Sequence, residues 1–164
     1  MLEAIIVFSI VGLDQWVKYL TDTHLMPLGA TVPLWEDVFH FTSAHNTGAA
    51  FGMLSGSRWL LIAVSLLACS VLAGFLIKKG RHQHLLLRIS LALILAGAAG
   101  NLIDRIALGY VRDMLDFRLI NFAIFNVADS AVTIGAVLLA ADVAFGKGKT
   151  LLSSNTSQPD SKAE

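Results

Sequence analysis

The sequence predicts an all-α integral membrane protein with four transmembrane helices, and three observations indicate this fold class. Hydrophobic residues make up 55% of the 164 residues, and the mean hydropathy is +0.69. Charged residues account for only 15%, whereas a soluble domain carries about 25% because its surface must be hydrated. The third observation is that the chain contains four long apolar segments.

Each predicted span is justified by its length, since roughly 20 mostly apolar residues are needed to cross the hydrocarbon layer. The spans are residues 4–20, 59–77, 85–103 and 122–145. The second span is free of charged residues. The other three contain polar or charged side chains, which are Asp14, Gln15, Lys18, Arg88, Asn101, Asn126, Asp129 and Asp142.

The distribution of basic residues predicts the orientation of these spans. The connection between the second and third spans and the C-terminal tail contain seven of them: Lys78, Lys79, Arg81, Arg88, Lys147, Lys149 and Lys162. The outer loop 21–57 contains none, and the outer loop 104–121 contains three that are matched by three acidic residues. Because basic residues favour the cytoplasmic side, we expect both termini in the cytoplasm.

We expect one membrane domain over residues 1–145, followed by a disordered cytoplasmic tail over residues 146–164, whose serine-rich composition is typical of disorder. The first span lacks a basic N-terminal region and a small-residue cleavage site, so we interpret it as an anchor that is retained. The loop 21–57 is too long for a simple connector. Within it, residues 38–42 alternate in the manner of a β-strand.

Net charge and cysteine content exclude several kinds of protein. The net charge is zero, which argues against a nucleic-acid partner, because such proteins need a basic surface. The single cysteine, Cys69, excludes an internal disulfide and a cysteine-based zinc site. The chain also contains no His-Glu-x-x-His metal motif, and no span contains a histidine. We therefore expect no metal site.

Carboxylates in or beside the spans are the strongest functional signal, because a charge at the bilayer centre costs about 2.5 to 3.5 kcal/mol. Asp14 and Lys18 share a helix face, as an ion pair or as residues that position a substrate. Three residues at the end of the third span also share a face, and a structural network is favoured there: Asn101, Asp104 and Arg105.

The second outer loop and the start of the fourth span supply further carboxylates. Asp113 and Asp116 are either solvated loop charges or members of a site. Asn126 and Asp129 are three residues apart, so they point the same way, as a helix cap or as part of a site. Two carboxylates about 3 Å apart share one proton and can activate water. Spacing alone does not decide which carboxylates form such a pair.

Five sequence blocks, in this order, resemble the lipoprotein signal peptidases, the type II signal peptidases of bacteria. The blocks are DQWVK (14–18), NTGAAFG (46–52), GNLIDR (100–105), VRDMLDF (111–117) and FNVADS (125–130). The resemblance implies an aspartic endopeptidase whose catalytic dyad is Asp113 and Asp129. It also implies a small extracytoplasmic β-cradle in the first outer loop.

The resemblance further implies which residues support the site and what the enzyme acts on. The family's site residues fall on Asp14, Asn46, Gly48, Asn101, Arg105 and Asn126, and we add Lys18, Asp104 and Ala128. The implied substrate is a diacylglyceryl-modified prolipoprotein, cleaved just before the lipidated cysteine of its lipobox. We expect a monomer in contact with membrane lipid in the bacterial cytoplasmic membrane, with its site near the outer face. No cofactor is expected, because the nucleophile is water.

The polar residues of the site lead to hypotheses about individual roles and to two alternative functions. Asn101 and Asn126 orient the dyad or the scissile carbonyl by hydrogen bonding, and Arg105 fixes the loop 104–121. A small proton-coupled transporter that uses buried carboxylates as relays is the alternative function. A non-catalytic scaffold, in which the aspartates serve only as caps and ion pairs, is a third possibility.

Overall fold

The computed structural model describes residues 1–49 and 52–145, and four long helices account for most of them. They are α1 (Leu2–His24), α2 (Arg58–Lys79), α3 (Leu85–Ala107) and α4 (Val127–Phe145). All four are long and apolar enough to cross a membrane, which confirms the predicted spans. The fourth begins at Val127 rather than at residue 122. The predicted disordered tail, residues 146–164, lies outside the described residues.

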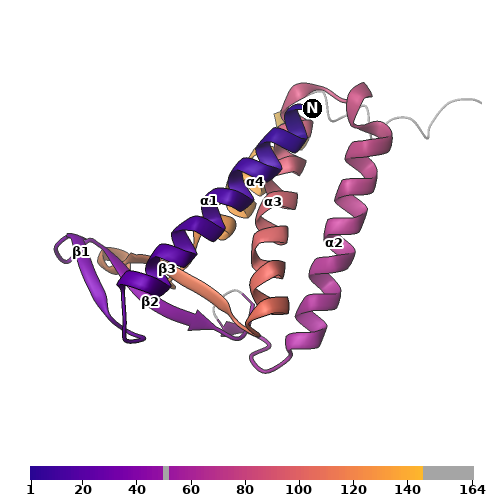
Figure 1. The fold of residues 1–164 in the computed structure, drawn as a ribbon. Helices are drawn as coiled ribbons and strands as arrows, with labels where there is room; N and C mark the ends of the chain where they lie inside the picture. The colour runs from indigo at the N-terminus through magenta and orange to yellow at the C-terminus, as the bar shows by residue number, and fades with distance from the viewer. Residues whose placement is uncertain (50–51, 146–164) are drawn as a thin grey trace, which may run out of the picture.

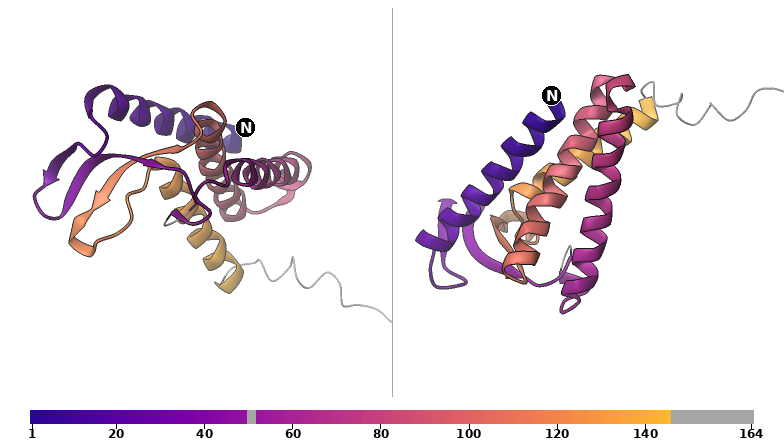
Figure 2. Two further views of the ribbon diagram at one scale, coloured as in Figure 1. Left: turned by 90° about the horizontal axis from the view of Figure 1, so that it is seen from below. Right: turned by 45° about the vertical axis from the view of Figure 1, so that its right-hand side comes forward.

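Helix α3 forms the centre of the bundle and contacts each of the other three helices. The N-terminus of α1 and the connection between α2 and α3 lie at one end of the bundle, and a small sheet lies at the other end (Figure 1). The connection contains the short 3-10 helix η2 (Gly80–His82). The right-hand view in Figure 2 shows the same separation between the sheet and the N-terminus.

Helices α3 and α4 approach each other closely because small residues line their interface. A Cβ atom at Gly135 would lie 2.7 Å from the backbone oxygen of Ser90, and one at Gly97 would lie 2.6 Å from Val132 Cγ2. Membrane helices associate through such contacts because lipid gives them no hydrophobic driving force. The outward faces of the bundle carry exposed apolar side chains, among them Phe8, Trp59, Leu67 and Val137.

The sheet at the far end has three antiparallel strands in the order β1–β2–β3. The strands are β1 (Thr31–Trp35), β2 (Phe39–Asn46) and β3 (Val111–Phe117). Two strands come from the first outer loop, where the sheet was predicted, and the second outer loop adds the third strand. A short 3-10 helix, η3 (Arg118–Ile120), follows β3. The predicted strand at residues 38–42 corresponds to the first part of β2.

Pairing between β2 and β3 brings the two outer loops into register. Asn46 pairs with Val111 and Ala44 pairs with Asp113. The register is irregular between Phe41 and Ala44, a local change that is common beside functional sites. The pairing places the end of β2 and the start of β3 next to the C-terminal end of α3 and the start of α4.

Candidate active site

Asp113 lies on β3 beside the start of α4, because the segment before α4 pairs with β3. The backbone N–H groups of Met114 and Leu115 donate to Phe125 O at 3.0 and 2.8 Å, and Phe125 N–H donates to Leu115 O at 3.1 Å. Asp113 is only 3% exposed. Asp113 is therefore a buried strand residue, which excludes the alternative that it is a solvated loop charge.

Asp129 lies in the first turn of α4, where it forms a reciprocal cap with Asn126. Asp129 N–H donates to Asn126 Oδ1 at 2.8 Å, and Asn126 N–H donates to Asp129 Oδ2 at 3.3 Å. This arrangement is that of a capping box, in which two residues three apart satisfy each other's free N–H groups. The cap predicted for Asn126 and Asp129 is present, and it leaves Asp129 Oδ1 available to a different partner.

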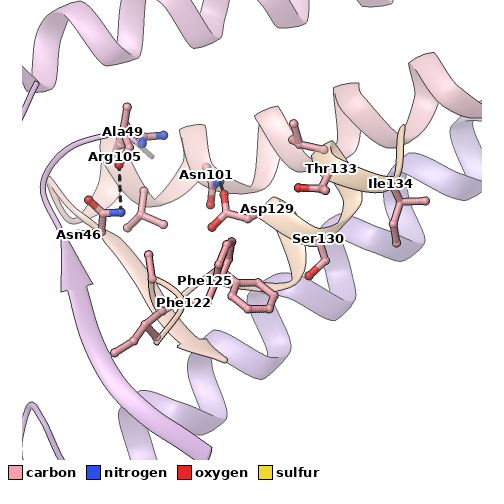
Figure 3. A pocket seen from close by; sticks show the side chains of 14 residues that line it. Asn46, Ala49, Asn101, Arg105, Phe122, Phe125, Asp129, Ser130, Thr133 and Ile134 are labelled. Atoms are coloured by element: carbon pink, nitrogen blue, oxygen red, sulfur yellow. Dashed lines mark hydrogen bonds between the residues drawn. The ribbon is translucent and has the colours of Figure 1, made fainter. Parts of the chain in front are cut away.

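Asn126 connects the two aspartates, through its side chain on one side and its backbone on the other. Its Nδ2 donates to Asp113 Oδ1 at 2.6 Å, while its backbone binds Asp129. Asn101 on α3 donates from Nδ2 to Asp129 Oδ1 at 2.7 Å, and its own Oδ1 accepts from Asn126 Nδ2 at 3.1 Å. Figure 3 shows the side chains of Asn101 and Asp129 next to each other at the cavity. Two asparagines thus hold two carboxylates that are 16 residues apart in the chain.

The environment of Asp113 favours its protonated form. Burial and, after it, the nearby charge of Asp129 raise the pKa of Asp113 from its ordinary value to about 7, against the hydrogen bond from Asn126. A carboxyl that titrates near neutrality beside a second carboxylate can hold the shared proton of a dyad. Two such groups titrate as a unit.

A buried cluster of charges lies behind the two aspartates. Lys18 Nζ lies 2.8 Å from Asp14 Oδ2 and 3.3 Å from Asp104 Oδ2. Lys18 also donates to Asn101 Oδ1 at 3.1 Å, so the cluster directly contacts the asparagine that binds Asp129. Asp14 accepts the backbone N–H of Ala128 at 2.9 Å and thereby fixes the start of α4. The predicted pairing of Asp14 with Lys18 on one helix face is observed.

Arg105 extends from α3 to the first outer loop. Its Nη2 donates to the backbone oxygen of Gly48 at 2.8 Å. Gly48 is held in turn by Asn46, whose Oδ1 accepts Gly48 N–H at 2.9 Å. A Cβ atom at Gly48 would collide with the backbone of Gly52 at 2.7 Å. The hypothesis that Arg105 fixes the loop 104–121 was wrong, because its hydrogen bond goes to the first outer loop.

Asp116 is buried but belongs to a different group of contacts. Its Oδ2 accepts from Thr42 Oγ1 at 2.7 Å and from Arg118 Nε at 3.0 Å. None of the hydrogen bonds described for the structure joins Asp116 to Asn126 or Asn101. Asp113 and Asp116, which spacing alone left equivalent, therefore differ in their surroundings.

A cavity of about 530 Å³ opens beside Asp129. Polar side chains from β2, α3 and the first two turns of α4 line part of it, and apolar side chains of α4 and of the preceding segment line much of the rest (Figure 3). The polar lining residues are Asn46, Asn101, Arg105, Asp129, Ser130 and Thr133. Within the described part of the chain, no group of three or more histidine, cysteine, aspartate or glutamate side chains has the arrangement of a metal site.

Three residues of this region were not identified from the sequence. Gln15 donates to the side chains of Asp14 and Asp104, and Arg112 donates to Asp104. Arg58 at the start of α2 donates to the backbone oxygens of residues 105 and 106 and so caps the end of α3. Arg112 adjoins Asp113 in the sequence, and its charge next to a candidate carboxylate is the one signal that could have identified it.

Comparison with known proteins agrees with this geometry. The model of the family described as signal peptidase (SPase) II matches residues 6–145. The lipoprotein signal peptidase of Brevibacillus brevis is 50% identical over 136 residues, which cover 82% of this chain and 89% of that protein. The chain belongs to the signal peptidase II family. Members of this family are proteases. The family and the four apolar helices together fit a multi-pass bacterial membrane protein.

Further relatives extend the similarity over nearly the whole chain. The lipoprotein signal peptidase of Clostridioides difficile is 41% identical over 150 residues, covering 92% of this chain and 99% of that protein. A bacterial membrane enzyme solved by the in meso method at 2.3 Å resolution superposes with a TM-score of 0.81 at 31% identity. That superposition covers 96% of this chain and 94% of the other.

Proposed function

We propose that this protein is an aspartic endopeptidase that removes signal peptides from diacylglyceryl-modified prolipoproteins, cleaving just before the lipidated cysteine. Membership of the signal peptidase II family supports the reaction class. The observation that carries the aspartic mechanism is the link through Asn126, which donates hydrogen bonds to both Asp113 and Asp129.

The proposed chemistry uses a water molecule between the two carboxyl groups. Asp129 acts as the base, because Asn101 Nδ2, the backbone N–H of Asn126 and the helix N-terminus all stabilise its carboxylate. Asp113, with its pKa raised to about 7 by burial and by Asp129, carries the shared proton. The pair resembles the dyads of aspartic proteases in its division of labour.

Each bond change in this mechanism has a partner. The Asp129 carboxylate removes a proton from water, the water oxygen attacks the peptide carbonyl carbon, and Asp113 donates its proton to the carbonyl oxygen. The resulting gem-diol collapses with cleavage of the C–N bond, and the leaving nitrogen takes the proton that Asp129 holds. One hydroxyl proton returns to Asp113. The products are a signal peptide with a free carboxylate and a lipoprotein with a free cysteine amino group.

The cavity suits a substrate that is partly lipid and partly peptide. Polar residues including Asp129 line one part of it, and apolar residues of α4 and of the segment 122–125 line another. We infer that the acyl chains and the apolar signal peptide lie along the helices while the scissile bond lies beside the polar residues. We also infer that the termini are cytoplasmic and that the sheet and site lie at the outer face, since the short connection between α2 and α3, with Lys78, Lys79 and Arg81 and no acidic residue, lies at the opposite end.

The test is cleavage of a purified diacylglyceryl prolipoprotein, followed by mass spectrometry of both products. We expect a single cut before the lipidated cysteine, and slower cleavage of the same precursor without its diacylglyceryl group. The transporter alternative has no support here, because α1 to α4 are each continuous helices in the described residues. Uncleaved precursor in the presence of folded protein would contradict the proposed function.

A further inference from the structure

Arg112 immediately precedes Asp113 on β3, and its backbone is held on both sides. The Arg112 N–H donates to Asp104 Oδ2 at 3.0 Å. The Arg112 backbone oxygen accepts from Asn126 Nδ2 at 3.3 Å, and the same Nδ2 binds Asp113. The start of β3 is therefore tied to α3 on one side and to the start of α4 on the other.

The guanidinium of Arg112 makes a second set of contacts with α3 and α1. Its Nη2 lies 2.8 Å from Asp104 Oδ1 and its Nε lies 3.2 Å from Asp104 Oδ2, which is a bidentate pairing. Its Nη2 also donates to Gln15 Oε1 at 3.0 Å, and its Nη1 donates to Asp22 Oδ2 at 3.2 Å. Only arginine presents a planar fork that can make these bonds together.

Arg112 also balances the charge of the cluster behind the dyad. Asp14 and Asp104 are 1% and 0% exposed, and Lys18, at 0% exposed, supplies one positive charge between them. Arg112 supplies the second positive charge through Asp104. Without Arg112 the cluster would hold one unbalanced negative charge in a region from which water is excluded, where charges act strongly on one another.

We propose that Arg112 is a positioning residue for the proposed aspartic dyad: it fixes Asp113 against α1 and α3 and neutralises the carboxylates behind it. The Arg112 guanidinium is bound by Asp104, Gln15 and Asp22, so we place its action on Asp113 and not on substrate. The proposal rests on the proposed function, because it assigns Asp113 to the dyad.

Charged and titratable groups lie on every element around Asp113. They are Asp14, Lys18 and Asp22 on α1, Asp104 and Arg105 on α3, Asp129 on α4, Asp116 on β3, and His40 and His45 on β2. Arg112 differs from the other cations in its place beside Asp113 in the chain. Its removal makes the surroundings more negative, which favours the protonated state of the dyad.

The experiment compares Arg112→Gln, Arg112→Lys and the control Arg118→Gln by measuring kcat, KM and the pH–rate profile on a diacylglyceryl prolipoprotein. Arg118 follows the same strand, and its side chain is 42% exposed and pairs with Asp116. We expect Arg112→Gln to lower kcat on the order of 100-fold, because small displacements of catalytic groups have such effects. We expect an unchanged KM and a pH–rate profile displaced towards higher pH.

Arg112→Lys separates the two roles, since it keeps the charge but loses the fork. We expect a lower kcat with the wild-type pH–rate profile, and wild-type behaviour from Arg118→Gln. If Arg112→Gln does not fold, Arg112→Lys decides the question. A kcat and pH–rate profile equal to those of the wild type in the folded Arg112 variants would overturn the proposal.

A readout that needs no activity distinguishes failure of this proposal from failure of the proposed function. The infrared C=O band of protonated Asp113 is identified by its loss in Asp113→Asn and is then titrated with and without Arg112→Gln. We expect the band to persist to higher pH in the variant, whether or not the protein cleaves a prolipoprotein. An unchanged titration would show that Arg112 does not act on Asp113.

Discussion

Lys18 Nζ lies 3.1 Å from Asn101 Oδ1, and this contact sets the orientation of both asparagine amides in the site. Because lysine has only donors, Asn101 must present its oxygen to Lys18 and its Nδ2 to Asp129. Asn126 then donates from Nδ2 to that oxygen and to Asp113. A buried cation on α1 thus arranges hydrogen-bond donors toward both carboxylates.

Replacement of Lys18 should therefore destabilise the protein and reduce its activity. Lys18→Met leaves Asp14 and Asp104 as buried carboxylates without their cation, and breaking a buried pair costs about 3 to 5 kcal/mol. We expect a marked fall in the unfolding temperature in detergent and a large loss of kcat. The control Lys78→Met changes an exposed residue in the last turn of α2, at the end of the bundle away from the site, and should leave both the unfolding temperature and kcat unchanged. Equal unfolding temperatures for the two variants would disprove the role of Lys18.

Gly100 should be intolerant of a side chain, because α3 passes very close to α1 and α4 at this point. A Cβ atom at Gly100 would lie 2.8 Å from Asp14 Oδ2 and 3.1 Å from Ala128 Cβ. Gly100→Ala should displace Asp14 and with it the start of α4, and lower kcat at least tenfold, since a displacement on the order of 1 Å has effects of this size. Gly74→Ala is the matched control, because a Cβ atom there would meet nothing within 4 Å. Comparable activities of the two variants would argue against close packing at Gly100.

The pKa of Asp113 predicts a pH dependence of stability with a defined sign. Burial, followed by the charge of Asp129, raises the pKa of Asp113 to about 7 in the folded protein, against about 4 in an unfolded chain. The stability contributed by the protonated Asp113 carboxyl is then fully present below about pH 4 and is lost as the pH rises through about 7. Asp113→Asn cannot ionise, so it should unfold at a higher temperature than the wild type at pH 8 and at a similar temperature at pH 4.

The control for that measurement is Asp116→Asn. This substitution removes an ion pair with Arg118 and a hydrogen bond from Thr42, so no gain in stability at pH 8 is expected from it. Thermal unfolding followed by circular dichroism at pH 4, 6 and 8 gives the comparison. A wild-type unfolding temperature above that of Asp113→Asn at pH 8 would contradict the raised pKa.

Cleavage should be insensitive to metal chelators, because the proposed nucleophile is water activated by carboxylates. We expect the same rate of prolipoprotein cleavage before and after incubation of the purified enzyme with EDTA. Loss of activity that is restored by adding back a divalent cation would contradict the proposed mechanism.

The features that could be predicted from the sequence are those encoded locally. Span lengths follow from runs of apolar residues, and the pairing of Asp14 with Lys18 follows from their spacing of four on a helix. The cap formed by Asn126 and Asp129 follows from a spacing of three at a helix start. Each of these involves residues close together in the chain.

The features that could not be predicted depend on contacts between distant segments. Strand β3 forms by pairing with β2, more than 60 residues earlier, so a reading of local patterns described its residues as loop. That pairing separates the environments of Asp113 and Asp116. Arg105 was expected to bind its own loop, but Gly48 offers a free backbone oxygen within reach of α3. Arg112 was counted only among the basic residues of the loop 104–121, and its ion pair with the buried Asp104 depends on how β3 packs against α3.

The most direct test of the central claim is cleavage of a diacylglyceryl prolipoprotein by the wild type, Asp113→Asn, Asp129→Asn and Asp116→Asn, compared at matched folding and detergent. Removal of any one member of a catalytic unit lowers the rate nearly as much as removal of all its members. We therefore expect near-complete loss of cleavage in the Asp113 and Asp129 variants, and activity close to wild type in Asp116→Asn. Turnover near the wild-type rate by either Asp113→Asn or Asp129→Asn would contradict the aspartic dyad.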